Sequence, residues 1–370
     1  MYLVKSVFDK LANEKDIAFL ILFYLLTFFG FAIKNIKNVE KKKWLGSCMG
    51  LAVVFSIMGT ETWHYFCSVL FCASIIKITG KRYVSNSTLF MFIYLTTYRI
   101  IVKYSAQNYN NNRHQRFISV MHMMLFTKMV GVAFEIHNSY TNKAKNKECN
   151  NSEVSDEIEI IDPTFVEIFH YTFSFLGLNT GPYIRYRTYD DYLHLPFARA
   201  VGIGFACKQM VLSLAMASTN SYLFFCFNFQ YVISQEFNDR SMLYRTMYMF
   251  IAFESFLIWV FSNFCITEAM ASSVGLGAYP VEGENKSAHG PTKNYTALKH
   301  KTYEEAKTAT YDFKTLNSAD AMTVHVSLWF PEMFRAYNKN IQYFLGMYLY
   351  KILPRNWNKI QFQYLFYPPL

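Results

Sequence analysis

The residues whose types best suit chemistry lie between Gly177 and Phe197, in the sequence GLNTGPYIRYRTYDDYLHLPF. Polar and charged side chains crowd together here between long apolar runs, and Arg185 and Arg187 alternate with tyrosines. Arginine binds carboxylate and phosphate groups, and tyrosine rings offer flat faces beside them. The stretch therefore suits an anionic substrate. It equally suits a membrane interface, where tyrosines lie at headgroup level and arginines snorkel toward it.

A turn cluster positions this stretch relative to the preceding apolar run, Phe165 to Leu178. The cluster consists of Asn179, Thr180, Gly181 and Pro182. Glycine permits positive φ, and proline fixes its own φ and restricts the residue before it. We therefore expect a helix that ends just before the arginines and tyrosines.

Three motifs carry a resemblance to a known family. The segment TGPYIRYRTY, from Thr180 to Tyr189, resembles the TGP-x-x-RYRTY segment of the membrane-bound O-acyltransferase family, in its lysophosphatidylinositol acyltransferase branch. GLGAYPV at Gly275 to Val281, preceded by Glu268, is a second match, and RAYNKNIQYFLGMYLYK at Arg335 to Lys351 is a third. The motifs occur in the family's order, and the resemblance spans the chain from about Trp44 to Arg355.

The resemblance implies an activity. In this family, a histidine within the membrane activates a lysophospholipid hydroxyl, which attacks an acyl-CoA thioester. Such a step needs a base with a pKa near neutrality and a site dry enough to prevent thioester hydrolysis. The implied function is a lysophospholipid O-acyltransferase of phospholipid remodelling in the endoplasmic reticulum, with lysophosphatidylinositol as the acceptor. Its partners would be acyl-CoA, which is a substrate, the lysophospholipid and membrane lipids, with no cofactor and no nucleic acid.

The resemblance also implies site residues. Asn338 matches an asparagine of the family, and its amide would position a substrate carbonyl or order a loop. Asn338 matches better than Asn340, because the spacing of Asn340 to Gln342 and Leu345 does not fit the motif. Without the resemblance, Asn338 would be interpreted as a helix-start or interfacial asparagine. The implied substrate-binding residues are Arg185, Tyr186, Arg187 and Tyr189.

The sequence departs from the family in its histidines. The family's catalytic histidine, in a WHG-x-x-x-G-Y pattern, lies tens of residues beyond the asparagine, whereas the last histidine here is His325 and the sequence ends at Leu370. We therefore expect a C-terminally incomplete domain lacking the family's histidine region. The 370-residue chain is predicted to transfer acyl groups at a negligible rate and a naturally extended form to be active. The explanations are a truncated gene product, a pseudoenzyme, or replacement of the base by His64 or His170.

The sequence is therefore compatible with two functions, an active acyltransferase and a non-catalytic protein. The alternative function is a non-catalytic member of the same fold that acts as a membrane lipid-binding or scaffold protein. A transporter or channel has only scattered ionisable residues in its favour: Lys128, Glu135, Lys208 and Glu254. Lys128 and Glu135 are seven residues apart, about two helical turns, and are expected to share one face of a helix as an interior pair.

Composition agrees with a membrane protein. Of the 370 residues, 52% are hydrophobic and 19% aromatic, and the apolar residues are grouped in long blocks separated by short charged loops. The net charge of +10 is attributed to a cytoplasmic membrane face rather than to nucleic acid. The seven cysteines show no CxxC spacing, so we expect neither disulfides nor a metal site. Neither a phosphate-binding glycine loop nor a GxSxG nucleophile motif is present.

These blocks predict an all-α fold, a polytopic transmembrane helical bundle formed by a single domain over residues 1–370, with no sheet-based domain. The main blocks are Ile17–Ile33, Trp44–Gly59, Trp63–Ile76, Ser85–Val102, Phe117–Phe134, Ala198–Ser218 and Tyr244–Val274. Two polar loops are expected, at residues 138–162 and 283–310. Asp312–Phe334, which mixes polar and aromatic residues, is expected to lie along the membrane interface as a partner of the arginine motif.

Overall fold

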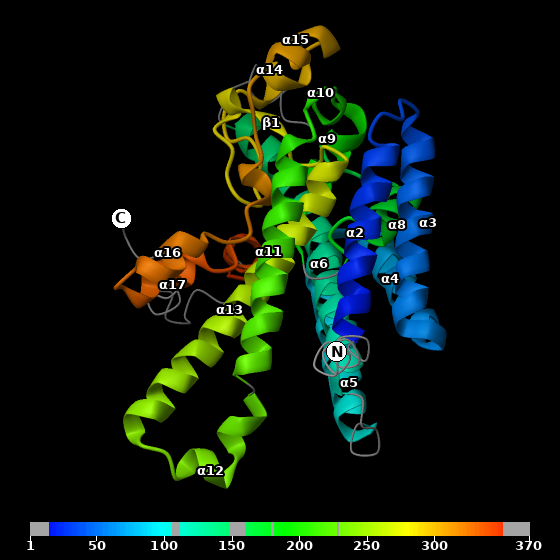
Figure 1. The fold of residues 1–370 in the computed structure, drawn as a ribbon. Coiled ribbons are helices and arrows are strands. Elements are labelled where there is room, and N and C mark those ends of the chain that lie inside the picture. The colour runs from blue at the N-terminus through cyan, green and yellow to red at the C-terminus, as the bar shows by residue number, and fades with distance from the viewer. Residues whose placement is uncertain (1–14, 106–111, 149–159, 179–180, 228, 351–370) are drawn as a thin grey trace.

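The computed structural model describes residues 15–105, 112–148, 160–178, 181–227 and 229–350. Within these ranges the chain is predominantly helical, and the strands β1 and β2 pair antiparallel (Figure 1). The elements are α2 (Lys15–Ile33), α3 (Val39–Met58), α4 (Thr62–Ile78), α5 (Tyr83–Ser105), α6 (Asn112–Glu148), α8 (Phe165–Phe173), α9 (Tyr186–His194), α10 (Phe197–Ala200), α11 (Gly204–Cys226), α12 (Gln235–Asn238), α13 (Met242–Ser273), β1 (Tyr279–Pro280), α14 (Tyr295–Lys299), α15 (Tyr303–Thr308), β2 (Tyr311–Asp312), α16 (Ala321–Val326), α17 (Phe330–Ala336) and α18 (Lys339–Phe344). Short 3₁₀ turns join several of these helices, and a π-helical turn, Leu345–Leu349, continues α18. The predicted helical fold is confirmed.

Side-chain caps set several helix boundaries. Asn38 accepts a hydrogen bond from the Lys41 N–H at the start of α3, and Gly59 ends that helix with φ +57°. Thr164 and Glu167 form a capping box at the start of α8. The predicted break between the helices α3 and α4 is confirmed, and it is a 3₁₀ turn at Gly59–Glu61.

The helices form two groups. Helices α3, α4, α5, α6 and α8 pack on one another, with α9 against α3 and α6. Helices α11 and α13 make the most extensive pairing in the described part of the chain, and α13 also packs on α2. Figure 1 shows α11 and α13 running side by side beyond the first group and turning back through α12. We call α11, α12 and α13 the arm.

The predicted helix at Ala198–Ser218 is wrong at its start. The chain leaves α10 at Val201, whose φ of −65° and ψ of 145° are extended, and α11 begins only at Gly204. Gly202 helps to explain the break, because glycine is a poor helix former. The predicted helix Phe165–Leu178 likewise ends early, at Phe173, and residues 174–178 continue outside any helix.

Both predicted polar loops are corrected. Residues 138–148 continue α6, because the sequence there is polar but contains neither glycine nor proline, and residues 149–159 lie outside the described ranges. Residues 283–310 form a folded cap that contains α14 and α15, with Leu298 and Ala306 buried. Asn285 fixes this cap by donating to Asp312 Oδ1 at 2.9 Å and to the Pro280 carbonyl at 3.1 Å.

The segment Asp312–Phe334 was predicted to pack against the arginine motif, and this prediction is wrong. Helices α16 and α17 pack against α13 through a cluster of Leu257, Phe261, Val324 and Ala336, and not against the arginine motif. The motif is instead covered by Tyr279 of GLGAYP and by His289 and Tyr295, which follow it. The apolar and aromatic stretch Tyr337–Leu353 is helical from Lys339 to residue 350, and residues 351–353 lie outside the described ranges.

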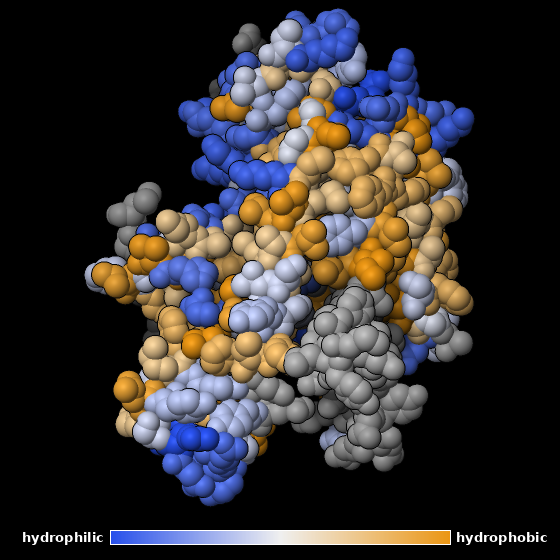
Figure 2. Space-filling model, in the orientation of Figure 1, coloured by the Kyte–Doolittle hydropathy of each residue, from blue (hydrophilic) through white to orange (hydrophobic). Residues whose placement is uncertain are grey.

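Apolar surface is concentrated in the middle of the molecule. Figure 2 shows hydrophobic residues across the centre of one face, with hydrophilic residues at the end that carries α14 and α15 and at the opposite end near α12. Three helical stretches in the described part are long and apolar enough to cross a membrane: Ile118–Ala144, Gly204–Ile233 and Met242–Ser273. An apolar band between two polar ends is the surface that a lipid bilayer requires.

Candidate active site

Glu135 of α6 anchors the arginine motif. Its carboxylate accepts the backbone N–H of Tyr186 at 2.9 Å and that of Arg187 at 3.1 Å. These amides lie at the start of α9, where the first N–H groups of a helix have no partner within the helix. The carboxylate therefore fixes the position and direction of α9 from a neighbouring helix.

Arg185 lies inside the protein. Its Nε is 3.5 Å from Glu135 Oε2, and its guanidinium donates to the His289 carbonyl at 3.1 Å. The side chains of Arg185 and Glu135 are 12% and 1% exposed, so solvent screens this ion pair little. The guanidinium thus links α6, the motif and the cap.

The tyrosines of the motif are packed inward. Tyr171 of α8 donates its hydroxyl to the Ile184 carbonyl at 2.6 Å, and its ring meets those of Tyr186 and Tyr189 edge to face. Both rings are buried. Arg185, Tyr186 and Tyr189 therefore lie in the protein interior and not at an exposed interface. Their role in substrate binding stays a prediction.

Arg187 and Asp191 connect the outer side of the motif to the cap. The guanidinium of Arg187 lies 3.4 Å from the centre of the Tyr295 ring. Asp191 accepts the Tyr279 hydroxyl at 2.6 Å and the Tyr295 hydroxyl at 2.7 Å. Burial raises the pKa of Asp191 above its ordinary value, although the two hydroxyls and the nearby arginine oppose the shift.

The GLGAYP motif makes a close approach to α10. Gly275 has φ +81°, and a Cβ at this position would lie 2.2 Å from the Ala198 carbonyl oxygen. Any other residue would have to push α10 away. The motif thus brings Tyr279 beside Asp191 of α9.

Asn338 and Asn340 differ in their surroundings. Asn338 precedes α18 in the left-handed conformation, with φ +52° and ψ +55°, and its side chain makes no capping hydrogen bond. Asn340 is 2% exposed and donates its amide to Ser318 Oγ at 3.0 Å, while its Oδ1 has no partner. The assignment of Asn338 as the functional asparagine rests on the motif and stays a prediction.

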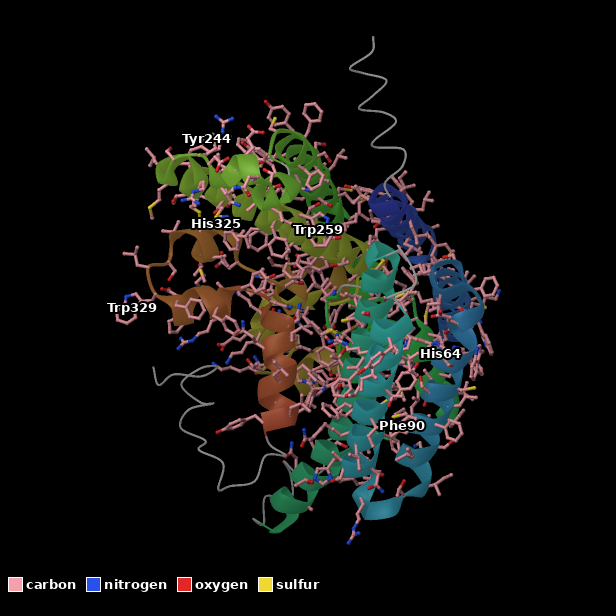
Figure 3. All side chains as sticks on the ribbon, turned by 90° about the horizontal axis from the view of Figure 1, so that it is seen from below. His64, Phe90, Tyr244, Trp259, His325 and Trp329 are labelled. Carbon is pink, nitrogen blue, oxygen red and sulfur yellow. The ribbon has the colours of Figure 1, made fainter. Side chains whose placement is uncertain are left out.

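His64 and His170 both make contacts typical of packed histidines. His64 Nδ1 lies 2.8 Å from the Tyr94 hydroxyl, and Figure 3 shows this residue on the side of the molecule away from His325. His170 Nδ1 lies 2.8 Å from Ser47 Oγ, and its ring meets Trp44 edge to face. His64 is half-buried, whereas His170 is buried and its Nε2 has no partner.

Sequence reasoning missed His289. Its carbonyl accepts from Arg185, its ring meets Tyr343 of α18 edge to face, and its Nδ1 has no partner. Burial and the charge of Arg185 lower the pKa of His289 to about 4, so the ring is neutral at pH 7. Through His289, the arginine motif borders the helix that follows Asn338. The polar composition of residues 283–310 concealed this position.

Lys128 and Glu135 share one face of α6 and point into the protein, as predicted, but they are not partners of each other. The Lys128 ammonium group donates to the carbonyls of Tyr171, Thr172, Ser174 and Leu176, at 3.3, 3.3, 3.5 and 2.8 Å. It thereby satisfies the end of α8 and the non-helical segment after it.

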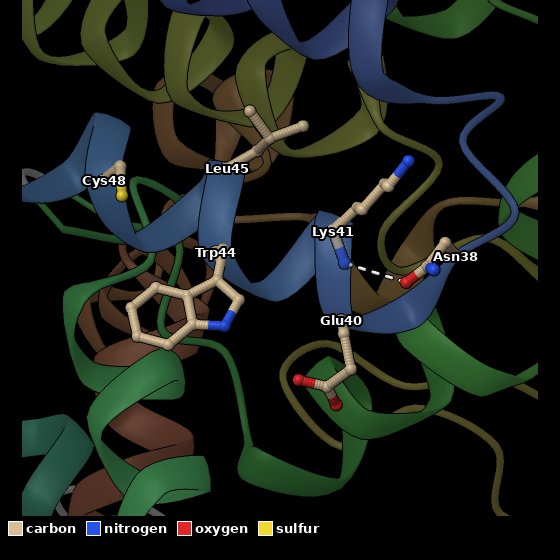
Figure 4. Close-up of a pocket in the computed structure, with 6 residues that line it drawn as sticks. All are labelled: Asn38, Glu40, Lys41, Trp44, Leu45 and Cys48. Carbon is tan, nitrogen blue, oxygen red and sulfur yellow. Dashed lines mark hydrogen bonds between the residues drawn. The ribbon is translucent and has the colours of Figure 1, made fainter.

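A hollow at the start of α3 is unlike an active site. It measures about 390 Å³ and lies over Asn38, Glu40, Lys41, Trp44, Leu45 and Cys48 (Figure 4). All of these residues belong to one helix and its cap, and Trp44 and Leu45 are exposed. The hollow therefore has no facing wall. Among the described residues, no group of three histidine, cysteine or acidic side chains could hold a metal ion.

Comparison with known sequences decides the family. The model of the membrane-bound O-acyltransferase family (MBOAT) matches residues 71–366, most of the chain. This protein is a member of the membrane-bound O-acyltransferase family. As a family member with three helices able to cross a bilayer, it is a membrane protein.

Curated relatives of this acyltransferase-family chain have consistent names. It is 29% identical to the membrane-bound acylglycerophosphatidylinositol O-acyltransferase frj of Drosophila melanogaster, over 88% of this chain and 67% of the relative. Proteins with the same description match from Xenopus laevis, at 27% identity over 88% and 68%, and from Homo sapiens, at 24% over 85% and 65%. The chain thus spans about two thirds of the length of these relatives.

Proposed function

We propose that this protein is a lysophospholipid O-acyltransferase that transfers a fatty acyl group from acyl-CoA to lysophosphatidylinositol during phospholipid remodelling in the endoplasmic reticulum. The observation that carries the proposal is the family match over residues 71–366. The names of the relatives, all acylglycerophosphatidylinositol O-acyltransferases, support the choice of acceptor.

The reaction is an acyl transfer. The free hydroxyl of the lysophospholipid attacks the thioester carbonyl, a carbon–oxygen ester bond forms, the carbon–sulfur bond breaks, and CoA leaves as its thiol with the hydroxyl proton. Both substrates carry phosphate groups, which arginine recognises. Arg187 is the better candidate for this contact, because Arg185 is already paired with Glu135. In the proposal, the amide of Asn338 positions the reacting carbonyl.

The test uses the protein expressed from its natural transcript in cells depleted of endogenous lysophosphatidylinositol acyltransferase activity. Membranes receive a polyunsaturated acyl-CoA and either lysophosphatidylinositol or lysophosphatidylcholine, and the diacyl product and released CoA are measured. We expect product from lysophosphatidylinositol above the background of untransfected membranes. Absence of transfer to either acceptor contradicts the proposed activity, and equal transfer to both contradicts the proposed headgroup. Imaging of the tagged protein against a reticulum marker tests the location.

Asn338 has a matched control in Asn294. Both residues adopt the left-handed conformation, with φ of +52° and +54°, and glycine tolerates this conformation without strain. We expect Asn338→Gly to abolish transfer and Asn294→Gly to preserve it, with equal amounts of folded protein. Equal activity of the two variants would exclude Asn338 from the chemistry.

A further inference from the structure

A pocket lies between the two helices of the arm and the segment that leads to α16. It measures about 380 Å³, within the range of ligand-binding cavities. Its lining comes from three places: α11 (Phe205, Gln209, Leu212, Met216), α13 (Phe261, Phe264, Cys265, Glu268) and residues Phe313, Lys314, Asn317, Ala319 and Ala321. Unlike the hollow on α3, this pocket has walls from several elements.

Most of the pocket wall is apolar and aromatic. Phe205 and Phe313 stack with ring centres 4.4 Å apart, and Phe264 packs on Tyr337, the residue before Asn338. The helices α11 and α13 are both long and apolar enough to cross a membrane, so lipid chains surround this region. A hydrocarbon chain is the ligand that such walls accept.

One end of the pocket is polar. Glu268 is 6% exposed, and its carboxylate accepts the Ser318 N–H at 2.8 Å and the Gln209 amide N–H at 3.1 Å. Lys314 stands at the rim with a side chain that is 65% exposed, and its ammonium group lies 3.7 Å from Asp312 Oδ2. The pocket therefore joins an apolar body to a buried polar end and a nearby cation.

Gln209 leaves one hydrogen-bonding group unused. Its NH₂ group donates to Glu268 Oε2 at 3.1 Å. The other amide atom, Gln209 Oε1, is then a buried acceptor without a partner. Buried polar atoms in native proteins nearly always have a partner, so the pocket calls for a ligand with a donor at this end.

The polar end is coupled to the family's asparagine segment through Ser318. The Ser318 hydroxyl accepts a hydrogen bond from the Asn340 side-chain amide at 3.0 Å, and the Ser318 carbonyl accepts one from the Lys339 N–H at 2.7 Å. Lys339 directly follows Asn338. A ligand at this end of the pocket thus lies against the segment that holds Asn338.

We propose that this pocket binds a single-chain lipid that carries a free hydroxyl beside its head, with the chain between α11 and α13 and the hydroxyl donating to Gln209 Oε1. Lys314 then faces an anionic headgroup. This binding site and the role of Gln209 in specificity are not part of the proposed function. Only the choice of a lysophospholipid as one of the probes rests on that function.

The experiment is photo-crosslinking in nanodiscs of phosphatidylcholine. The probes are lysophosphatidylinositol and a neutral monoacylglycerol, each with a diazirine in its acyl chain, and the adducts are mapped by mass spectrometry. We expect both probes to label Met216 and Phe264, which line the pocket and are only partly exposed. Unlabelled lysophosphatidylinositol should compete, and its analogue with a methylated glycerol hydroxyl should compete at least about tenfold more weakly, because a site built for a hydroxyl rejects a ligand that lacks the donor.

Two variants test the pocket and its polar end separately. Ala319→Phe fills the pocket and should remove the adducts with both probes, while Gln209→Met should remove the preference for the free hydroxyl. Gln235→Met on α12 is the matched control and should change neither. Labelling of Phe250 and Phe253, which are exposed on α13, reports that each variant is folded and in lipid.

The outcomes separate this inference from the proposed function. Adducts confined to exposed α11 and α13 residues, or equal competition by the methylated analogue, overturn the site. Pocket labelling by monoacylglycerol with no competition by lysophosphatidylinositol supports the pocket and contradicts the proposed acceptor. Pocket labelling by both probes, lost in Ala319→Phe, supports the inference whatever the transfer assay shows.

Discussion

Helices α6 and α11 have almost the same hydropathy and opposite surroundings. The apolar window of α6 has a mean hydropathy of 1.3 and that of α11 has 1.4, yet 78% of the first window is buried in the protein and 6% of the second. Hydropathy measures fitness for an apolar environment, and protein interior and lipid are both apolar. Hydropathy therefore does not tell the two helices apart. What distinguishes α6 is that its ionisable residues Lys128 and Glu135 have partners inside the protein.

The largest expected effect comes from removing the acid that holds the arginine motif. Glu135→Gln leaves Arg185 as a buried, unpaired charge, and breaking such a pair costs about 3 to 5 kcal/mol of folding stability. The measurement is thermal unfolding in detergent, followed by intrinsic fluorescence.

The control for this change is in the arm. Glu236→Gln removes an ion pair with Arg240, whose atoms are 2.6 Å apart but whose side chains are exposed, and it should leave the unfolding temperature unchanged. A similar loss in both variants would show that burial does not distinguish the two regions.

A valine pair compares the two helices directly. Val130 on α6 is 0% exposed and Val211 on α11 is 67% exposed. Val130→Ala opens a cavity in a packed interior and should cost about 2 kcal/mol. Val211→Ala only exchanges one lipid contact for another and should stay within about 0.5 kcal/mol. Unfolding in the same detergent compares them, and equal losses would mean that α11 is covered by protein.

Asp191 gives a smaller effect with a defined pH dependence. Its folded-state pKa is raised above the ordinary 3.8, so the folded protein binds the proton more tightly than the unfolded chain does. The stability that this proton contributes is present below about pH 3.8 and is lost as pH rises through the raised pKa.

The advantage of the wild type over Asp191→Asn should therefore shrink as pH rises. Unfolding temperatures of both proteins at several pH values from 4 to 7 provide the measurement. An advantage that grows with pH would show that the hydroxyls of Tyr279 and Tyr295, together with Arg187, outweigh burial.

The smallest effect on stability is expected at Arg187. Arg187→Gln removes a guanidinium that lies over Tyr295, and it should weaken binding of lysophosphatidylinositol or CoA severalfold while changing the unfolding temperature little. Arg185→Gln should do the reverse, because Arg185 is committed to Glu135. Binding in nanodiscs and unfolding are measured for both. Unchanged affinity in Arg187→Gln would identify this arginine as a purely structural contact.

The sequence predicted those features that depend on local pattern. The helical class and the break between the blocks Trp44–Gly59 and Trp63–Ile76 follow from apolar blocks and glycines. The family follows from the three motifs. Each of these features is encoded within a short stretch of chain.

Features that depend on distant partners escaped prediction. Residues 138–148 were expected to form a loop because they are polar, but a solvated helix is equally polar, and the absence of glycine and proline lets α6 continue through them. The cap at residues 283–310 is held by a few buried groups such as Asn285, and the place of His289 beside Arg185 depends on that cap. The partner of Glu135 could not be chosen among the cations by spacing alone. Such contacts join residues that are far apart in the sequence. Glu135 and the start of α9, for example, are about 50 residues apart.

The contacts of Lys128 have a consequence for how the chain enters the membrane. The carbonyls that bind its ammonium group are 43 to 48 residues further along the chain. Lys128 is therefore synthesised well before its partners. An unpaired charge makes insertion of an apolar helix costly. We therefore expect α6 to settle at its final depth only after Leu176 has been synthesised. Residues 118 to 176 would then integrate as one unit, and a ribosome stalled before Leu176 should hold α6 in a state that alkali still extracts from the bilayer.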